Sequence, residues 1–463
     1  MDKKFKKTLF IFRRDLRLED NTGLIFALEN SQKVIPAFIF TPEQIEKNPY
    51  RSDHCLKFMI DSIEDLQEQL KKKKGRLFLF QGEPEEIVNE CIKRLQIDAV
   101  VVNRDYTPYS RQRDAKIEKT CKAGRIDFHS FDDALLHPPE TTLKKDHKPY
   151  TIFTPYFRNA SKIQVIPPVP NRFTNYFTDS IPFAENFSIL SQFVKNKSIH
   201  PQFAGGRSEG LKILSHLGKL KKYKELRDFP AEQGSSHLSP YLKFNVCSPR
   251  EVYAAICKHL SPHHDLIRSL YWRDFFSGIA FFFPHVFKGA FHPKFDKMKW
   301  SYDKKNFQHW TKGSTGFPIV DAGMREMNET GFMHNRVRMI TASFLAKDLH
   351  IDWRWGEKYF AQTLIDYDPA VNNGNWQWSA STGCDAQPYF RIFNPWKQQI
   401  KFDPECIYIK KWIPELQDLP PKTIHNWFNP KYRPAELKYP APMVEHEEES
   451  KKALREYKRA SVR

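Results

Sequence analysis

The 463-residue chain lacks several features that would decide its class at once. No apolar run approaches the ~20 residues that a membrane-spanning helix needs, which argues against an integral membrane protein. Only the short run TLFIF (8–12) precedes Arg13; it is too brief for the core of a signal peptide and predicts a first strand instead. The seven cysteines never form a C-x-x-C pair. We therefore expect no disulfide framework, no bound metal and a cytoplasmic location.

The chain has too few acidic residues to balance its basic ones. It carries 73 lysines and arginines against 55 acidic residues, a net charge of +18. Such an excess favours a polyanionic partner, with nucleic acid ahead of acidic lipid. A basic cytosolic enzyme without such a partner remains the alternative that composition alone leaves open.

The first part of the chain alternates short apolar runs with longer helical patterns. The runs are TLFIF, VIPAFIF, RLFLF, AVVVN and RIDFHSF, all within residues 8–131. This alternation predicts an α/β domain over 1–131, a doubly wound parallel sheet with helices on both faces. No G-x-G-x-x-G follows the first strand, so the dinucleotide-binding fingerprint is absent.

Residues 132–200 are rich in proline and show little periodicity, which predicts a connector. From residue 201 to 463 the pattern is helical with breaks at proline and glycine. All ten tryptophans lie at or beyond Trp272. We therefore expect a C-terminal all-α domain in which the aromatic chemistry is concentrated.

The segment GFMHNRVRMITASFLAKDL (331–349) predicts one helix. At helical spacing Asn335, Arg338 and Met339 share a face, whereas Arg336 points about 100° away. Arg338 and Asn335 are thus candidates for a polar ligand and Arg336 for a phosphate. An ordinary amphipathic helix is the alternative.

The segment LIDYDPAVNNGNWQW (364–378) carries two closely spaced carboxylates. Proline after Asp368 favours extended backbone, in which Asp366 and Asp368 point the same way. They are candidates for an acid–base pair, a metal pair, or acceptors for ring N–H groups and a partner arginine. Trp376 and Trp378 would diverge on a helix, which suits either core packing or a wall between a cofactor and a cavity.

Three serines in GSSHLSPYL (234–242) precede a helical pattern. Hydroxyls and free N–H groups at a helix start bind phosphate, although a simple helix cap explains them equally well.

Longer motifs carry a resemblance. IFRRDLRLEDNTGL, YKELRDFP, GSSHLSPYL, YWRDFF, GFPIVDAGMREM, GFMHNRVRMITASFLAKDLHIDW and LIDYDPAVNNGNWQWSASTGCDAQPYFRIFNP resemble the photolyase/cryptochrome family, most closely the bacterial class I cyclobutane pyrimidine dimer photolyases. The resemblance implies a U-shaped FAD in the helical domain, working as the fully reduced anion. Light would drive an electron to a pyrimidine dimer flipped out of DNA, and the cyclobutane ring would open.

The resemblance also implies roles for individual residues. Around FAD it implies Tyr223, Ser235, Ser236, His237, Leu238 and Ser239 at the phosphates, and Asn335, Arg338, Asp366, Asp368 and Asn372 at the ring. For electron transfer from the surface it implies Trp376, Trp353 and Trp300. For the dimer and DNA it implies Trp272, Trp378, Met339, Ser269, Arg227, Arg336 and Arg391. We expect a monomer that binds damaged DNA and no membrane.

Three positions depart from the family pattern. Ser269 stands where a glutamate usually contacts the damaged bases, and Phe332 stands where tryptophan is frequent. Tyr109 and Ser110 replace the Asn-Glu pair of folate-binding members. The expected antenna is therefore open between folate, a deazaflavin, another flavin and none.

Three other functions compete with dimer repair. A cryptochrome-like photoreceptor is disfavoured by Asn372, where cryptochromes often carry Asp or Cys. A (6-4) photolyase needs a histidine for proton transfer, and members typically show it where this chain has Asn335 and Met339. An iron–sulfur relative would need cysteines that are missing here.

Overall fold

The computed structural model describes residues 3–194, 202–386 and 388–462. The end of the expected connector, 195–200, and the first residue of the expected helical domain lie outside these ranges. The described chain forms two compact units. The first contains the residues up to 194, Phe203–Lys219 and Ser236–Pro284; the second contains Gln202, Leu220–Ser235 and the chain from His285 onward.

The first unit is built on a five-stranded sheet in the order β3-β2-β1-β4-β5, in which every pairing is parallel. The strands are β1 (Phe5–Phe12), β2 (Ser31–Phe40), β3 (Phe78–Gln81), β4 (Ala99–Asn103) and β5 (Asp127–Phe131). In β1, Leu9 pairs with Ile35 on one side and Val100 on the other. The parallel sheet predicted from the alternating runs is confirmed.

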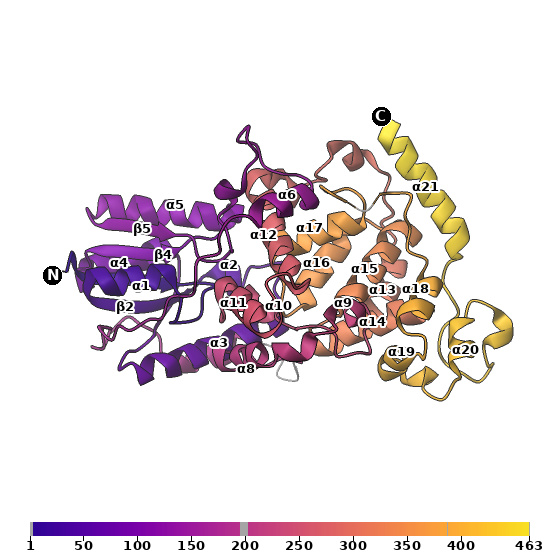
Figure 1. Cartoon of the computed structure of the whole chain (residues 1–463), viewed down its shortest axis with the longest axis horizontal. Helices are drawn as coiled ribbons and strands as arrows, with labels where there is room; N and C mark the ends of the chain where they lie inside the picture. Colours follow the sequence, from indigo (N-terminus) through magenta and orange to yellow (C-terminus); the bar gives the residue numbers. More distant parts are fainter. Residues whose placement is uncertain (1–2, 195–201, 387, 463) are drawn as a thin grey trace. The chain divides into compact units, whose positions relative to one another are not determined.

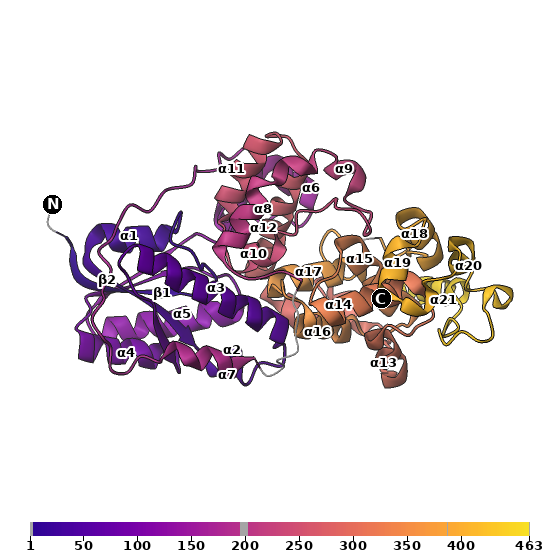
Figure 2. The ribbon, with the colours of Figure 1, turned by 90° about the horizontal axis from the view of Figure 1, so that it is seen from below.

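Helices cover both faces of this sheet because its strands are apolar on both sides. Leu9 and Ile11 share a core with residues of α4 and α5, whereas Phe10 packs toward Gly23 of α1 on the opposite face. Figure 2 shows α1 on one side of the sheet and α4 and α5 on the other. The helices of the first unit are α1 (Thr22–Asn30), α2 (Pro42–Ile45), α3 (Asp53–Lys72), α4 (Pro84–Leu95), α5 (Pro108–Ala123), α6 (Phe153–Ala160), α7 (Leu190–Phe193), α8 (Arg207–Ser215), α10 (Ser239–Lys243), α11 (Pro249–His259) and α12 (Leu266–Phe282).

The second unit is helical, as the pattern after residue 201 predicts (Figure 1). Its helices are α9 (Tyr223–Leu226), α13 (Lys304–Lys312), α14 (Pro318–Thr330), α15 (Asn335–Ser343), α16 (Trp353–Thr363), α17 (Pro369–Ser379), α18 (Pro395–Phe402), α19 (Ile407–Trp412), α20 (Pro421–His425) and α21 (His446–Val462), with a π-helical segment, η6 (Phe344–Asp348), continuing α15. Short 3-10 helices lie at η1 (Pro139–Thr142), η2 (Phe187–Ile189), η3 (Leu217–Leu220), η4 (Pro284–Phe287), η5 (Pro293–Lys297), η7 (Pro414–Leu416) and η8 (Pro430–Tyr432).

The helix predicted over 331–349 begins four residues later. Gly331 takes a positive φ of 73° and ends α14, and the side chain of His334 accepts from the backbone N–H of Arg336 to cap α15. A left-handed residue and a capping side chain both interrupt helical geometry. The connector is also more regular than its lack of periodicity predicts, because it contains the helix α6.

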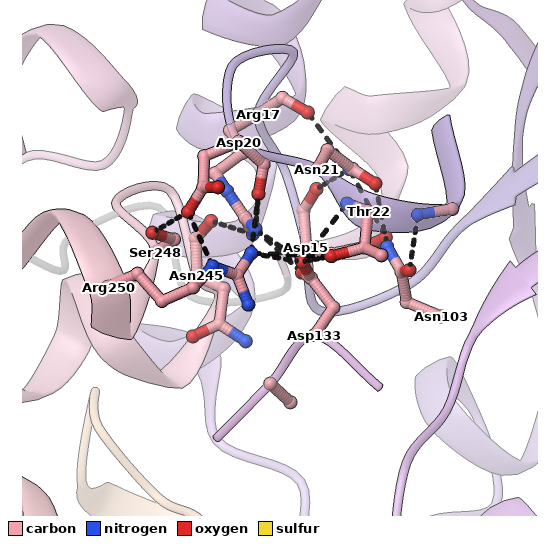
Figure 3. Close-up of polar contacts among 12 residues, drawn as sticks. Asp15, Arg17, Asp20, Asn21, Thr22, Asn103, Asp133, Asn245, Ser248 and Arg250 are labelled. Atoms are coloured by element: carbon pink, nitrogen blue, oxygen red, sulfur yellow. Dashed lines mark hydrogen bonds and ion pairs between the residues drawn. The ribbon is translucent and has the colours of Figure 1, made fainter. Parts of the chain in front are cut away.

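A buried ion network joins three stretches of the first unit that are distant in sequence (Figure 3). Arg17, in the loop after β1, has no exposed side-chain surface and donates from Nη2 to both oxygens of Asp133, at 2.8 and 2.7 Å. Arg250 of α11 donates to the same carboxylate at 2.8 Å and to Asp20 at 2.9 Å. One carboxylate thus holds two guanidinium groups and fixes the loop after β1 against α11.

Asp133 stays ionised in this network although it is completely buried. Burial alone would raise the pKa of its carboxyl, but attraction to Arg17 and Arg250 outweighs burial and lowers the pKa to about 2. The backbone N–H and hydroxyl of Thr22 also donate to Asp133, at 3.2 and 2.9 Å. The start of α1 is therefore held by the same group.

Replacing Asp133 with asparagine should lower the free energy of unfolding of the first unit by about 3–5 kcal/mol, because two buried cations lose their shared counter-charge. The pKa of Asp133 is lower in the folded state than the ordinary value of 3.8. The stability it contributes is therefore complete above that value and is lost as the pH falls through 2. Denaturant unfolding at pH 7 and near pH 2, followed by circular dichroism, measures the difference.

The control is Asp146→Asn, since Asp146 makes an exposed ion pair with Lys148. A deficit for Asp133→Asn that is the same at both pH values would contradict the assignment.

Candidate functional site

The guanidinium of Arg338 is locked in place by three hydrogen bonds. Nη1 and Nη2 donate to the two oxygens of Asp366 at 3.1 and 2.9 Å, and Nε donates to the carbonyl of Met333 at 2.7 Å. The Asp366 side chain is almost fully buried, whereas that of Arg338 is 24% exposed. This two-pronged geometry holds the cation at a defined place while one edge of it remains open.

Asp368 has a different set of partners from Asp366. Its side chain caps α17 and accepts from the backbone N–H groups of Ala370 and Val371 at 3.0 and 3.2 Å. Pro369 occupies the first turn of the helix, where a missing N–H costs nothing. The extended backbone predicted at Asp368 is confirmed by its φ of −118° and ψ of 122°.

Asn372 is held by a buried acid on the neighbouring helix. Its Nδ2 donates to the backbone carbonyl of Glu357 at 3.1 Å and to the carboxyl Oε1 of the same residue at 3.0 Å. Burial raises the pKa of Glu357 to about 7, and the hydrogen bond from Asn372 offsets only part of that effect. Sequence reasoning missed Glu357; its one signal is an acid in an otherwise aromatic stretch, WRWGEKYF.

Trp376 is buried against α16. Its ring lies 4.9 Å from that of Phe360, and a Cβ on Gly356 would approach the ring within 2.1 Å, so only glycine fits there. Trp353 belongs to the same buried core, and Trp300 packs against that core. The three tryptophans expected to transfer electrons thus belong to, or pack against, one apolar cluster of the second unit.

The predicted divergence along α15 is confirmed. Asn335 and Met339 lie together, with the amide nitrogen 3.9 Å from the sulfur. Arg336 turns elsewhere: it pairs with Asp228 at 2.7 Å and its guanidinium lies 4.4 Å from the centre of the Phe402 ring. A phosphate would have to compete with Asp228 for this arginine.

In the first unit, Trp272 of α12 is half-buried and stacked on a ring from the connector. Phe153 lies parallel to it, with ring centroids 3.7 Å apart and an angle of 6°. Ser269, one turn earlier, is exposed. Sequence reasoning missed Phe153 because the connector shows no periodicity to mark its buried residues.

The other predicted residues divide between the two units. Tyr223, Ser235, Trp378, Arg227 and Arg391 lie in the second unit, and Ser236, His237, Leu238 and Ser239 lie in the first. Tyr223 is buried, and the guanidinium of the exposed Arg227 lies 5.6 Å from its ring. Trp378 is half-buried while Trp376 is buried, in keeping with the divergence predicted for the pair.

The part of the chain that the structure describes contains neither a cluster of metal ligands nor a membrane-spanning helix. No group of three or more His, Cys, Asp or Glu residues there is arranged to hold a metal ion. No described helix has the length and apolarity to cross a membrane.

Two family models of DNA photolyase match this chain, one in its N-terminal part and one in its C-terminal part. Residues 8–172 match the model described as DNA photolyase, and residues 266–459 match the FAD binding domain of DNA photolyase. The chain belongs to the DNA photolyase family. The resemblance stated from the motifs is thereby confirmed, together with the presence of an FAD-binding domain.

Individual relatives match nearly end to end. The deoxyribodipyrimidine photo-lyase of Alkalihalophilus pseudofirmus is 37% identical, over 96% of this chain and 97% of its own. Among solved structures, an archaeal photolyase from Sulfolobus tokodaii with two FAD molecules is 43% identical, with a TM-score of 0.88 over 98% of this chain and 100% of its own. A bacterial class III photolyase from Agrobacterium tumefaciens is 35% identical, with a TM-score of 0.91 over 100% and 99%.

Replacing Glu357 with glutamine should remove a pH dependence of stability that extends from pH 4.5 to about 7. The folded-state pKa of about 7 lies above the ordinary 4.5, so the wild type loses stability as the pH rises through 7. Over that range Glu357→Gln should gain on the wild type by about 3 kcal/mol. Denaturant unfolding at pH 5 and pH 8 measures this gain, with the exposed Glu405→Gln as the control. An equal difference at both pH values would count against a buried, neutral Glu357.

Proposed function

We propose that this chain is a deoxyribodipyrimidine photo-lyase, which uses light and FAD to split cyclobutane pyrimidine dimers in DNA. The observation that carries the proposal is the locked Arg338–Asp366 pair, within a domain that matches the photolyase FAD-binding domain. When bound, reduced FAD supplies one electron on illumination and takes it back after the ring opens. The enzymes that match over nearly the whole chain carry the same activity in their names.

The donors and acceptors around Arg338 fit a reduced, anionic flavin ring. Arg338 supplies a cation for the negatively charged edge of the ring, and Asp366 and Asp368 are acceptors for its N–H groups. Because Nδ2 of Asn372 donates to Glu357, its Oδ1 is directed away from that acid and is suited to accept from a ring N–H. Asn335 completes the ring contacts, and Tyr223 with residues 235–239 would hold the phosphates.

The chain's own residues also suit a pyrimidine dimer flipped out of DNA. Trp272 and Trp378 each keep part of a ring open, and stacking on aromatic rings tolerates any base. Phe153 fixes the plane of Trp272. The net charge of +18 draws the phosphate backbone without reading sequence, and Arg227 and Arg391 are exposed cations available for it. We place these functions in residues 201–463.

We also propose that the α/β domain, residues 1–131, holds an anionic antenna chromophore at the carboxyl ends of β1 and β4. The chain order reverses there, and open parallel sheets bind ligands at that point. Arg13 and Arg113 share the single carboxylate of Asp114, at 2.8 and 3.1 Å. Their side chains are only 8% and 7% exposed, and the Nη2 atom of each has no hydrogen-bond partner among the described residues.

An anionic group would relieve this excess of buried positive charge. Burial lowers the pKa of Arg13 to about 10, and repulsion from Arg113 adds to the effect. The Sulfolobus tokodaii photolyase with two FAD molecules is described as implying a novel light-harvesting cofactor. A second FAD, whose pyrophosphate is anionic, is therefore favoured over a neutral pigment.

The proposed activity predicts that the reduced protein, mixed with an oligonucleotide containing a thymine dimer, restores base absorbance in blue light and not in darkness. Arg338→Met should retain less flavin after gel filtration and should repair less, because the anionic ring loses its fixed cation. Recovery of the ultraviolet absorbance of the bases follows the reaction, because opening of the cyclobutane ring restores the conjugated C5=C6 double bonds of both pyrimidines. Arg325→Met is the matched control, since Arg325 makes a similar two-pronged pair with Glu415.

Light-dependent repair by the wild type would also show that Ser269 suffices where a glutamate is usual. A dimer that persists while bound flavin responds to light would instead indicate a photoreceptor or a different lesion.

The antenna proposal predicts that the purified protein, titrated with FAD, takes up a second equivalent of flavin. Arg113→Met should lose that equivalent and keep the first, because only the site in the α/β domain is altered. Absorbance and flavin released per mole of protein measure both. A second equivalent that binds Arg113→Met as tightly as the wild type would overturn the assignment of this site.

A further inference from the structure

A series of aromatic rings extends from Trp376 toward the surface. This series does not include Trp353 and Trp300, the tryptophans expected to carry electrons to Trp376. The ring of Trp376 lies 6.2 Å from that of Trp310, at an angle of 71°. Phe360 fills the space beside both: it lies 4.9 Å from Trp376 and 6.0 Å from Trp310, on which it stacks at 10°. Trp310 is completely buried.

From Trp310 the series continues to the surface. Phe307 lies 5.7 Å from Trp310 and 5.2 Å from Trp355, and Trp355 lies 5.7 Å from Tyr302. Trp355 is half-buried, and Tyr302 is 62% exposed. Successive ring contacts thus connect a buried tryptophan with solvent.

The composition of this series suits the passage of electrons. Tryptophan and tyrosine are the side chains most easily oxidised by one electron, whereas phenylalanine is not oxidised under the same conditions. Trp310 and Trp355 are therefore places where an electron vacancy can rest. Phe360 and Phe307 shorten the gaps between them, since electron tunnelling falls steeply with distance.

The hydrogen bonds of the indole groups give the series a direction. Nε1 of Trp310 donates to the backbone carbonyl of Thr341 at 3.1 Å. A carbonyl acceptor stabilises positive charge on the ring but is too weak a base to remove the proton. Nε1 of Trp376 is buried without a partner among the described residues. A radical cation is consequently more stable on Trp310 than on Trp376, which favours movement of the vacancy outward.

The inner part of the series is fully buried in the core, whereas Phe307 and Trp355 pack against its margin. Trp310 and Phe360 belong to the apolar core, where large aromatic residues are usual. Trp355 follows Trp353 by two residues on α16, so the two rings point to different sides of the helix. Trp353 enters the core, and Trp355 contacts Phe307 and Tyr302 near the surface.

We propose that Trp310 and Trp355 form a second electron route to Trp376, parallel to the one through Trp353 and Trp300. The inference rests on the proposed function and adds to it a separate entry for reducing electrons. One electron would pass from Trp376 to bound oxidised flavin. An electron from Trp310 would then reduce the Trp376 radical cation, and an electron from Trp355 would reduce the Trp310 radical cation. A thiol in solution then gives one electron to Trp355 and its proton to water, and two such thiyl radicals combine to a disulfide.

The test uses the oxidised holoenzyme and the variants Trp353→Phe, Trp310→Phe and both together, with Trp412→Phe as a control from the same core margin. Flash photolysis without thiol measures the yield of long-lived tryptophan radical. Prolonged illumination without thiol, followed by peptide mass spectrometry, shows which side chains have been oxidised. We expect Trp353→Phe to keep part of the radical yield and the double variant to lose it. Oxidation at Trp355 should disappear in Trp310→Phe while oxidation at Trp300 persists.

The proposal is overturned if Trp353→Phe alone abolishes the radical, or if Trp355 is oxidised equally in Trp310→Phe. Trp355→Phe, altered near the surface, repeats the radical measurement should Trp310→Phe fail to fold. Dimer repair by chemically reduced wild type tests the proposed function separately, since it needs no electron from either route.

Discussion

The first unit depends on one buried carboxylate placed between two arginines. Moving an ion from water into a protein interior costs several kcal/mol, and Asp133 offsets that cost for both Arg17 and Arg250, with Asp20 as a second counter-charge for Arg250. The three groups come from the loop after β1, the loop after β5 and α11. The same β1 loop carries Arg13 to the edge of the sheet, so the ion network also decides where the proposed antenna site can form.

In the second unit, groups that we propose to face a ligand are likewise held by a partner. Arg338 is fixed by Asp366, and Asn372 is fixed by Glu357, in both cases by a partner on a different element. The orientation of both groups is therefore set in the absence of a ligand, and such preorganisation removes a cost from binding. Phe153 does the same for the ring of Trp272 in the first unit.

The difference between what sequence predicts and what it misses follows from the range of the interaction. The sheet and the shared face of Asn335 and Arg338 were predictable, because they are set by periodicity within a single element. The start of α15 was not, because a histidine cap and a left-handed glycine override the helical pattern. Glu357, Phe153 and the Asp228 partner of Arg336 were also beyond reach. Each is defined by packing between segments whose spacing along the chain carries no signal.

Two helices of the second unit show one way in which buried aromatics acquire a second use. On α16 and on α17, tryptophans two residues apart send one ring into the core and leave the other half-buried. The inward member of each pair is buried, whereas the outward Trp355 packs against the margin of the core. Each outward ring keeps part of its apolar surface in water, and the further contact that we propose is a stacked base for Trp378 and the passage of an electron for Trp355. Because low dielectric makes an unstabilised positive charge expensive, the Thr341 carbonyl at Trp310 is the feature that would let a vacancy pass between inside and outside.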